Sequence, residues 1–277
     1  MNDILVVDDD RSTNHLTSAL LKSQGYRVAS ASDGLEALDL TRERCFDLII
    51  VDVWMPRMTG LDLLAELRRR PEMPKVIVMT ADDTPETLLQ AVKEQAYRFM
   101  RKPVEPDALT KLVREVLESK PASRPIEVLS ARPDWVEILV PCEVQSVERI
   151  HALLSRLAAD LPEEVRESVE TAFRELLMNA IEWGGELDPS RSVRIAYLRA
   201  KRMLLYSIAD PGKGFRFEGL THSAVANPSE TSFEHLQVRE EKGLRPGGFG
   251  LLMTRAAVDE LIYNEAQNEV VFVKYLD

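Results

Sequence analysis

The chain has 277 residues, 45% of them hydrophobic, and this length suits two domains with separate cores better than one. A formal net charge of -11 disfavours broad binding to nucleic acids or anionic membranes, because both carry negative charge themselves. No apolar run approaches the ~20 residues of a membrane helix, and the two cysteines, Cys45 and Cys142, match no disulfide framework or metal spacing, so we expect a cytoplasmic protein.

In the first 119 residues, short apolar runs alternate with segments of helical spacing. Continuous apolar runs are typical of strands buried on both faces, so the pattern predicts a parallel sheet wrapped by helices. A weaker strand, AYRFM, and a helix from Pro106 to about Ser119 complete this half. The apolar runs are ILVV at 4–7, LIIV at 48–51 and KVIVM at 75–79.

Acidic residues follow two of these predicted strands. Asp8 and Asp9 come directly after the first strand, and Asp52 comes directly after LIIV. Ligands bind at the carboxyl edge of such sheets, and three carboxylates gathered there need a hard cation such as Mg²⁺ to neutralise them. Taken alone, the DDD run also fits a solvated turn, since aspartate is mostly exposed.

A hydroxyl and an ammonium group are predicted at the same edge. Thr80 ends the strand VIVMT, and Lys102 precedes a proline after the weaker strand. Both groups can donate hydrogen bonds to the oxygens of a phosphoryl group carried by a neighbouring carboxylate.

Residues 1–119 resemble the receiver domain of two-component response regulators in the motifs VVDDD, DVWMPRMTG, MTA and Lys-Pro. The resemblance implies a flavodoxin-like doubly wound fold and an upstream histidine kinase or other phosphodonor. It also implies a loop shaped by Met55, Pro56 and Gly60, and a switch aromatic at Phe99, which could equally be an ordinary core residue. The implied roles are Asp52 as phosphoacceptor, Asp8, Asp9 and Asp52 as Mg²⁺ ligands, and Thr80 and Lys102 as contacts of the phosphoryl group.

Residues 120–133, KPASRPIEVLSARP, contain three prolines and few large apolar residues, which predicts a linker of limited flexibility. The remaining residues, 134–277, begin with the strand-like WVEILV and two amphipathic helices. Alternating strands follow at VRIAYL and LLYSIAD, then a long polar segment, a helix after Gly250 and a last strand, VVFVKY.

Glu175 and Asn179 stand four residues apart on the second of these helices, so they project from the same face. They could simply pair with each other or with water. The helix begins near Pro162, and its predicted buried stripe is Val165, Val169, Ala172, Leu176 and Ala180.

Two glycine-containing segments follow this acid and amide. In SIADPGKGF a strand ends in Asp210, which can accept a hydrogen bond from an exocyclic amine, while Gly212 and Gly214 permit close approach of a base. In RPGGFGLL the glycines Gly248 and Gly250, with Gly247, open a helix whose N-terminal N–H groups can face phosphate oxygens.

In this order the three motifs resemble the ATPase domain shared by gyrase, Hsp90, histidine kinases and MutL, over about residues 134–277. Within that superfamily the chain is most similar to the anti-sigma-factor serine kinases, whose first motif reads E-x-x-x-N-A-x-x-H-G. The histidine of that motif is Trp183 here. The resemblance implies an α/β sandwich with a mixed sheet covered by helices, and it implies ATP and Mg²⁺ as cofactors.

The resemblance also implies roles for single residues. Glu175 is the implied general base, and the segment from Phe215 to Pro246 is the implied lid over the phosphates. The implied Mg²⁺ ligand is Asn179, the adenine contact is Asp210, and the remaining nucleotide contacts are Gly212, Gly214, Lys242, Arg245, Gly248 and Gly250.

We therefore expect a signalling protein in which phosphorylation of Asp52 regulates an ATP-binding domain. That domain is expected to phosphorylate Ser or Thr on an anti-sigma antagonist, or to bind a sigma factor. A non-catalytic ATP-dependent binding module, transfer to histidine or to the chain's own Asp52, and histidine-kinase-like transfer to another protein remain open. Against histidine kinase activity, the one histidine between the linker and the ATPase motifs is His151, which is followed by alanine rather than an acid.

Overall fold

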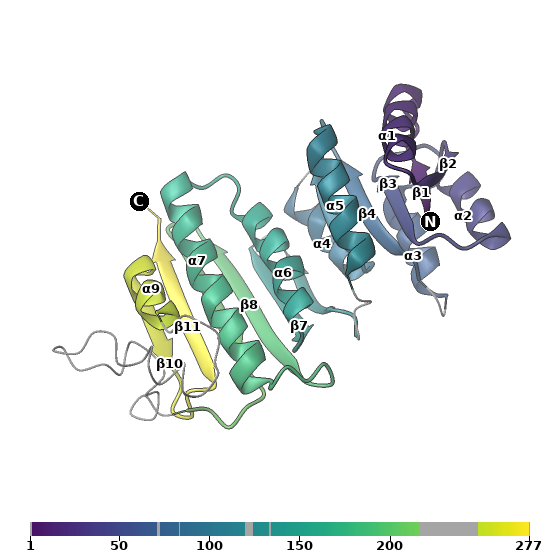
Figure 1. Cartoon of the computed structure of the whole chain (residues 1–277). Coiled ribbons are helices and arrows are strands. Elements are labelled where there is room, and N and C mark those ends of the chain that lie inside the picture. The colour runs from purple at the N-terminus through teal and green to yellow at the C-terminus, as the bar shows by residue number, and fades with distance from the viewer. Residues whose placement is uncertain are drawn as a thin grey trace. The chain divides into compact units, whose positions relative to one another are not determined.

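The computed structural model describes residues 2–70, 73–82, 84–119, 124–132, 134–215 and 249–276. The chain divides into two compact units, Met1–Pro121 and Ala122–Asp277 (Figure 1). Among the described helices, none combines the length and the apolar character that crossing a bilayer requires.

Unit 1 is a parallel five-stranded sheet with strand order β2-β1-β3-β4-β5, as the apolar runs predict. Helices α1 and α5 share one hydrophobic core with one face of the sheet, and α2, α3 and α4 share a second core with the other face. This doubly wound arrangement confirms the flavodoxin-like fold. The strands are β1 (Asp3–Val7), β2 (Arg27–Ala31), β3 (Leu48–Asp52), β4 (Lys75–Thr80) and β5 (Arg98–Arg101), and the helices are α1 (Arg11–Ser23), α2 (Gly34–Glu43), α3 (Gly60–Arg68), α4 (Pro85–Lys93) and α5 (Pro106–Glu118).

Unit 2 contains a six-stranded sheet with strand order β10-β11-β9-β8-β7-β6. Helices α6, α7 and α9 lie against one face of it (Figure 1). The strands are β6 (Glu127–Arg132), β7 (Trp135–Pro141), β8 (Ser192–Ala200), β9 (Met203–Ala209), β10 (Glu260–Tyr263) and β11 (Glu269–Tyr275), and the helical elements are α6 (Val144–Leu157), α7 (Glu163–Asn179), the π-helical turn η1 (Ala180–Gly184) and α9 (Gly250–Ala257).

An aromatic stack forms the centre of the hydrophobic core of unit 2. Tyr206 on β9 lies parallel to Phe272 on β11, with ring centroids 4.8 Å apart, and is tilted against Phe173 of α7 at 5.6 Å. Such pairs add attraction beyond the apolar area that they bury. The stack fixes α7 on the sheet and therefore sets where its polar face points.

Two features of unit 2 differ from the expectation. Every described strand pair is antiparallel, whereas a mixed sheet was expected. The segment expected to be a linker contains β6, which pairs with β7 across a bulge near Val128 and Ser130. Its sequence, EVLSAR, has too few apolar residues to predict a strand. The strand is stabilised by backbone hydrogen bonds to β7 at the edge of the sheet rather than by burial of its side chains.

Candidate functional site

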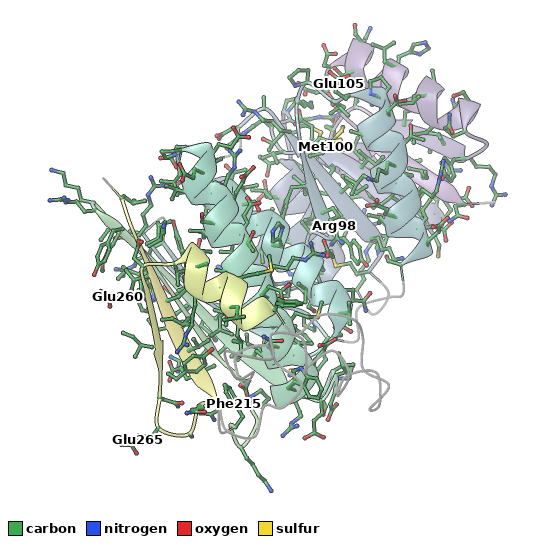
Figure 2. The ribbon with its side chains drawn as sticks, turned by 60° about the vertical axis from the view of Figure 1, so that its left-hand side comes forward. Arg98, Met100, Glu105, Phe215, Glu260 and Glu265 are labelled. Carbon is green, nitrogen blue, oxygen red and sulfur yellow. The ribbon has the colours of Figure 1, made fainter. Side chains whose placement is uncertain are left out.

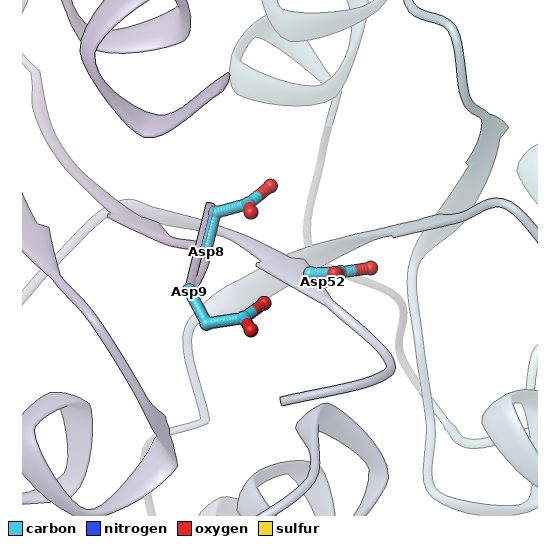
Figure 3. Close-up of side chains that lie close together, drawn as sticks. All are labelled: Asp8, Asp9 and Asp52. Atoms are coloured by element: carbon cyan, nitrogen blue, oxygen red, sulfur yellow. The ribbon is translucent and has the colours of Figure 1, made fainter. Parts of the chain in front are cut away.

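The carboxylates of Asp8, Asp9 and Asp52 meet at one edge of the first sheet. Because β1 and β3 are neighbours, with Val7 opposite Val51, the residues at their carboxyl ends lie side by side. Carboxylate oxygens of the three residues lie within 4.8 Å of one another (Figure 3). Three oxygen ligands at this spacing, two buried and one exposed, fit a hard divalent cation that keeps some of its water.

Asp10, the third acid of the DDD run, has a different role from its two neighbours. Its carboxylate accepts a hydrogen bond from the Thr13 N–H at 2.7 Å and so caps the N-terminus of α1. This hydrogen bond lowers the pKa of Asp10. The run therefore combines a helix cap with two residues of the carboxylate cluster.

Lys102 bridges two of the clustered carboxylates. Its Nζ lies 2.8 Å from Asp8 Oδ2 and 2.9 Å from Asp52 Oδ2, and its backbone N–H donates to the Thr80 carbonyl. Burial lowers the pKa of Lys102, but the hydrogen bonds to the two carboxylates outweigh this effect, so its pKa is raised. Burial raises the pKa of Asp52, against the opposing effect of Lys102.

The Thr80 hydroxyl is engaged locally rather than with the cluster. It donates to the Asp82 carbonyl at 2.8 Å and accepts from the Asp82 N–H at 3.0 Å. Thr80 is buried and ends β4, whose Met79 lies opposite Asp52. Its hydroxyl would therefore have to exchange partners before contacting a group on Asp52.

Phe99, the aromatic residue considered as a switch, is partly buried and packs against the core shared with α2, α3 and α4.

The loop after Asp52 is tied down at both ends. The Val53 N–H donates to the Met79 carbonyl at 3.0 Å, and the Gly60 N–H donates to the Val53 carbonyl at 2.9 Å. Met55 is buried, whereas Pro56 is exposed. Hydrogen bonds made by Val53, the residue that follows Asp52, thus hold both ends of this loop.

In unit 2, Asp210 is surrounded by backbone. It directly follows β9, and its Oδ1 accepts a hydrogen bond from the Gly212 N–H at 2.8 Å. A Cβ added to Gly184 would lie 2.2 Å from Asp210 Cγ, so η1 can approach the carboxyl only because that residue is glycine. Burial raises the pKa of Asp210. The other carboxylate oxygen can accept a hydrogen bond from a ligand amine.

Glu175 lies against the N-terminus of α9. A Cβ added to Gly250 would lie 2.2 Å from Glu175 Oε2, so the carboxylate contacts the backbone of the first helical residue. The N-cap residue, Phe249, provides no side-chain cap. Helix N-termini favour negative charge, so the carboxylate occupies a position that also suits a phosphate oxygen.

Asn179 ends α7 one turn after Glu175, and η1 continues directly from it. π-helical turns are rare and frequently mark functional sites. Gly184 and Gly185 end this helical segment, but nothing in the sequence predicts the π turn itself. Trp183, on η1, is half exposed.

The Gly212–Gly214 turn and the β10–β11 hairpin lie side by side. The Phe215 ring packs edge-on against Tyr263 of β10, with centroids 5.7 Å apart. Figure 2 labels Phe215 near the yellow strands of this hairpin. The Asn268 side chain donates to the Gly212 carbonyl at 3.1 Å. Lys242, Arg245, Gly248 and all but the first residue of the expected lid lie outside the described residues.

The candidate histidine and the cysteines have unremarkable surroundings. His151 Nε2 lies 3.9 Å from Glu170 Oε2, between α6 and α7. Both cysteines are free thiols, with Cys45 exposed and Cys142 buried. Burial raises the pKa of Cys142 to about 11, so its thiol stays protonated at neutral pH.

Comparisons with known proteins match a different family to each of the two units. Residues 4–114 match the response regulator receiver domain, and residues 140–274 match the histidine kinase-like ATPase domain. The chain is 42% identical over 116 residues to the transcriptional regulatory protein ZraR of Klebsiella oxytoca, which covers 42% of the chain and 26% of that protein. It therefore spans about a quarter of the length of this relative.

A second relative is matched over most of its length. The DNA-binding response regulator MtrA of Mycobacterium leprae is 31% identical over 202 residues, which cover 72% of this chain and 88% of the relative. Among solved structures, the chemotaxis protein CheY4 of Vibrio cholerae is 33% identical, with a TM-score of 0.41, over 42% of this chain and 98% of that one.

The charge on Asp52 is expected to destabilise the fold when no divalent cation is present. A carboxyl group whose pKa is raised by folding destabilises the protein above that pKa, and the penalty disappears as the pH falls through it. We expect Asp52→Asn to raise the free energy of unfolding at pH 7 by on the order of 1 kcal/mol. Calorimetry in chelator should show a higher Tm for unit 1, with a gain that shrinks on acidification.

The matched control is Asp39→Asn, which removes an exposed carboxylate paired with Arg42 on α2. Exposed pairs of this kind contribute little, so its Tm should stay close to that of the wild type. An Asp52→Asn protein that is equal to or less stable than the wild type would contradict the electrostatic account of the cluster.

Proposed function

We propose that this chain, a response regulator whose receiver domain is followed by a histidine kinase-like ATPase domain, accepts a phosphoryl group on Asp52 and thereby controls an ATP-dependent protein kinase domain. Together the two matched domains indicate phosphorylation-controlled signalling. The observation that carries the proposal is the Lys102 ammonium, held between Asp8 and Asp52 within the carboxylate cluster.

In the first step Asp52 acts as the nucleophile. An oxygen of its carboxylate attacks the phosphorus of a phosphohistidine on an upstream kinase, the P–N bond breaks, and an acyl phosphate forms. Lys102 neutralises charge on the incoming phosphoryl oxygens. The Thr80 hydroxyl donates a hydrogen bond to one of them after its hydrogen bond to the Asp82 carbonyl breaks. Asp8, Asp9 and Asp52 would hold Mg²⁺, which supplies further positive charge to the phosphoryl oxygens.

Labelling by a small phosphodonor such as acetyl phosphate tests this step. Wild-type protein should gain one phosphoryl group by intact mass in the presence of Mg²⁺, because the donor supplies the group directly. Asp52→Asn and removal of Mg²⁺ should each abolish the gain, and Lys102→Met should reduce it. Asp39→Asn should label like the wild type, and labelling that persists in Asp52→Asn would exclude Asp52 as the acceptor.

The second unit has the residues for phosphoryl transfer from ATP. The free carboxylate oxygen of Asp210 and the adjoining glycine backbone suit the exocyclic amine and the flat ring of adenine. Asn179 would hold Mg²⁺ on the ATP phosphates, which supplies charge neutralisation during transfer. Glu175, beside the N-terminus of α9, takes the proton from a serine or threonine hydroxyl as its oxygen bonds to the γ-phosphorus. The bond from the γ-phosphorus to the oxygen that bridges it to the β-phosphate breaks at the same time, and ADP leaves.

The proposed substrate is an anti-sigma antagonist, with a sigma factor as a second binding partner. Both follow from the resemblance to anti-sigma kinases, and the upstream phosphodonor of Asp52 would be a histidine kinase. Trp183 is half exposed and stands where those kinases carry histidine. That position is neither the proposed base, Glu175, nor the proposed metal ligand, Asn179, so the change leaves catalysis possible.

Substitutions in α7 should separate binding from transfer. Asn179→Ala should weaken Mg-ATP binding in calorimetry, because it removes a metal ligand, whereas Glu175→Gln should retain binding and lose transfer to a serine-containing antagonist by roughly 100-fold or more. Glu167→Gln, on the exposed side of the same helix, is the control. Equal loss of binding in both variants would make Glu175 structural.

The same assay decides between the alternatives. Tight ATP binding without transfer in the wild type would identify a nucleotide-dependent binding module. An acid-labile product would indicate transfer to histidine or aspartate.

Asp210→Asn should narrow the preference of the ATPase domain for adenine over guanine nucleotides, measured as the ratio of their affinities. An amide adds hydrogen-bond donors at a position where the carboxylate only accepts.

Phosphorylation of Asp52 is expected to change the second domain's activity in the same chain. It adds charge beside Thr80 and Lys102, and such changes bias the surfaces that receivers present to partners. Transfer rate and antagonist affinity, measured with and without phosphodonor, should differ by roughly tenfold in wild type and not at all in Asp52→Asn. Identical values in phosphorylated and unphosphorylated wild type would exclude regulation within one chain.

A further inference from the structure

A strained turn lies in the loop that follows Asp52. The Met58 N–H donates to the Pro56 carbonyl at 2.8 Å, which closes a three-residue turn around Arg57. Arg57 has a backbone φ of 68°, a value that residues other than glycine, asparagine and aspartate rarely adopt. This γ-turn is an uncommon, strained conformation, so something outside the loop must hold it.

The Arg57 side chain supplies that hold. Its guanidinium forms an ion pair with Oδ2 of Asp33, whose side chain is only 2% exposed. Oδ1 of the same carboxylate accepts hydrogen bonds from the Leu35 and Glu36 N–H groups at 2.9 and 3.0 Å and so caps α2. Each oxygen of this buried carboxylate therefore has its own partner, and Arg57 supplies the compensating charge.

The turn is rigidly connected to the phosphoacceptor. Between Asp52 and Arg57 the backbone is fixed by the hydrogen bond from Val53 to Met79 and by the burial of Met55. Beyond Arg57, Gly60 donates back to Val53. A loop held at both ends beside Asp52 and at its midpoint against α2 has no freedom to shift without moving the residues next to that carboxylate.

We propose that the Arg57–Asp33 ion pair is a positioning device for phosphoryl transfer: it holds the β3–α3 loop in its strained conformation and thereby fixes the backbone that flanks Asp52. The inference rests on the proposed phosphoacceptor role of Asp52. Arg57 acts on the carboxylate cluster through the loop alone.

The chain permits the charge and the helix cap to be separated. Asp33→Asn retains a side-chain oxygen for the α2 cap, because asparagine caps helices as well as aspartate, but it removes the charge that Arg57 needs. Arg57→Ala removes the ion pair from the other side, and Arg57→Lys keeps a cation. Arg57→Gly removes both the ion pair and the left-handed strain.

The experiment measures phosphorylation rates of the full chain with phosphoramidate across a range of Mg²⁺ concentrations. Arg57→Ala and Asp33→Asn should each lower the rate constant at saturating Mg²⁺ by about tenfold, since small misplacements of reacting groups have effects of this size or larger. The double variant should be no slower than either single one. Arg57→Lys should recover much of the rate, and Arg57→Gly should be as slow as Arg57→Ala.

Arg42→Ala, which removes an exposed ion pair with Asp39 on α2, should label like the wild type. Wild-type rates in Arg57→Ala and Asp33→Asn, additive losses in the double variant, or recovery in Arg57→Gly would each overturn the proposal. Absence of labelling in the wild type would refute the phosphoacceptor role of Asp52, and the inference would fall with it. Labelled wild type with unaffected variants refutes the positioning role alone.

Discussion

The Lys102 ammonium, held between the carboxylates of Asp8 and Asp52, is the interaction on which the chemistry of the first unit depends. Three carboxylates within 4.8 Å of one another repel strongly where water is partly excluded. Lys102 reaches two of them because β5 ends beside β4, and the Lys102 N–H continues the ladder to the Thr80 carbonyl. The order of the parallel strands, rather than any local motif, thus brings a cation and three acids together.

The second unit handles a partly buried carboxyl differently. Asp210 accepts a hydrogen bond from the Gly212 N–H and lies against the backbone of Gly184. Burial is the main cause of the rise in its pKa. Glu175 instead lies at a helix N-terminus, where partial positive charge comes from the backbone. The first site balances charge with a lysine ammonium, whereas in the second site backbone groups lie beside the carboxylates and Arg191 opposes the rise in the pKa of Asp210.

The strength of each prediction followed the strength of the local pattern. The buried strands β1, β3 and β4 are continuous apolar runs and were predicted, and the position of Asp8, Asp9 and Asp52 followed from where those runs end. Strand β2 reads RVASA and lies at the edge of its sheet, with a largely exposed or half-buried pattern. Strands β6 and β10 are likewise edge strands, whose pairing depends on neighbours distant in the sequence.

The site features that the sequence did not predict are those set by tertiary contact. Arginine has no intrinsic preference for the left-handed region, so the turn at Arg57 cannot be read from PRM, and its partner Asp33 belongs to a different βα unit. Similarly, the residue type of Thr80 indicates a hydroxyl near the cluster, but whether it contacts the cluster depends on the loop that follows.

That loop links the Thr80 hydroxyl to α4. The Asp82 carboxylate accepts from the Thr84 N–H at 3.2 Å and from the Thr87 hydroxyl at 3.4 Å, while its backbone holds the Thr80 hydroxyl. A phosphoryl group on Asp52, if it forms as proposed, would compete for that hydroxyl, because a charged oxygen is a stronger acceptor than a carbonyl. If the hydroxyl leaves, Asp82 loses the contacts that fix its backbone, and the first turn of α4 loses a restraint. Under the proposed phosphorylation, charge added at the end of β3 would therefore change the restraints on α4, a helix that a second domain or a partner could contact.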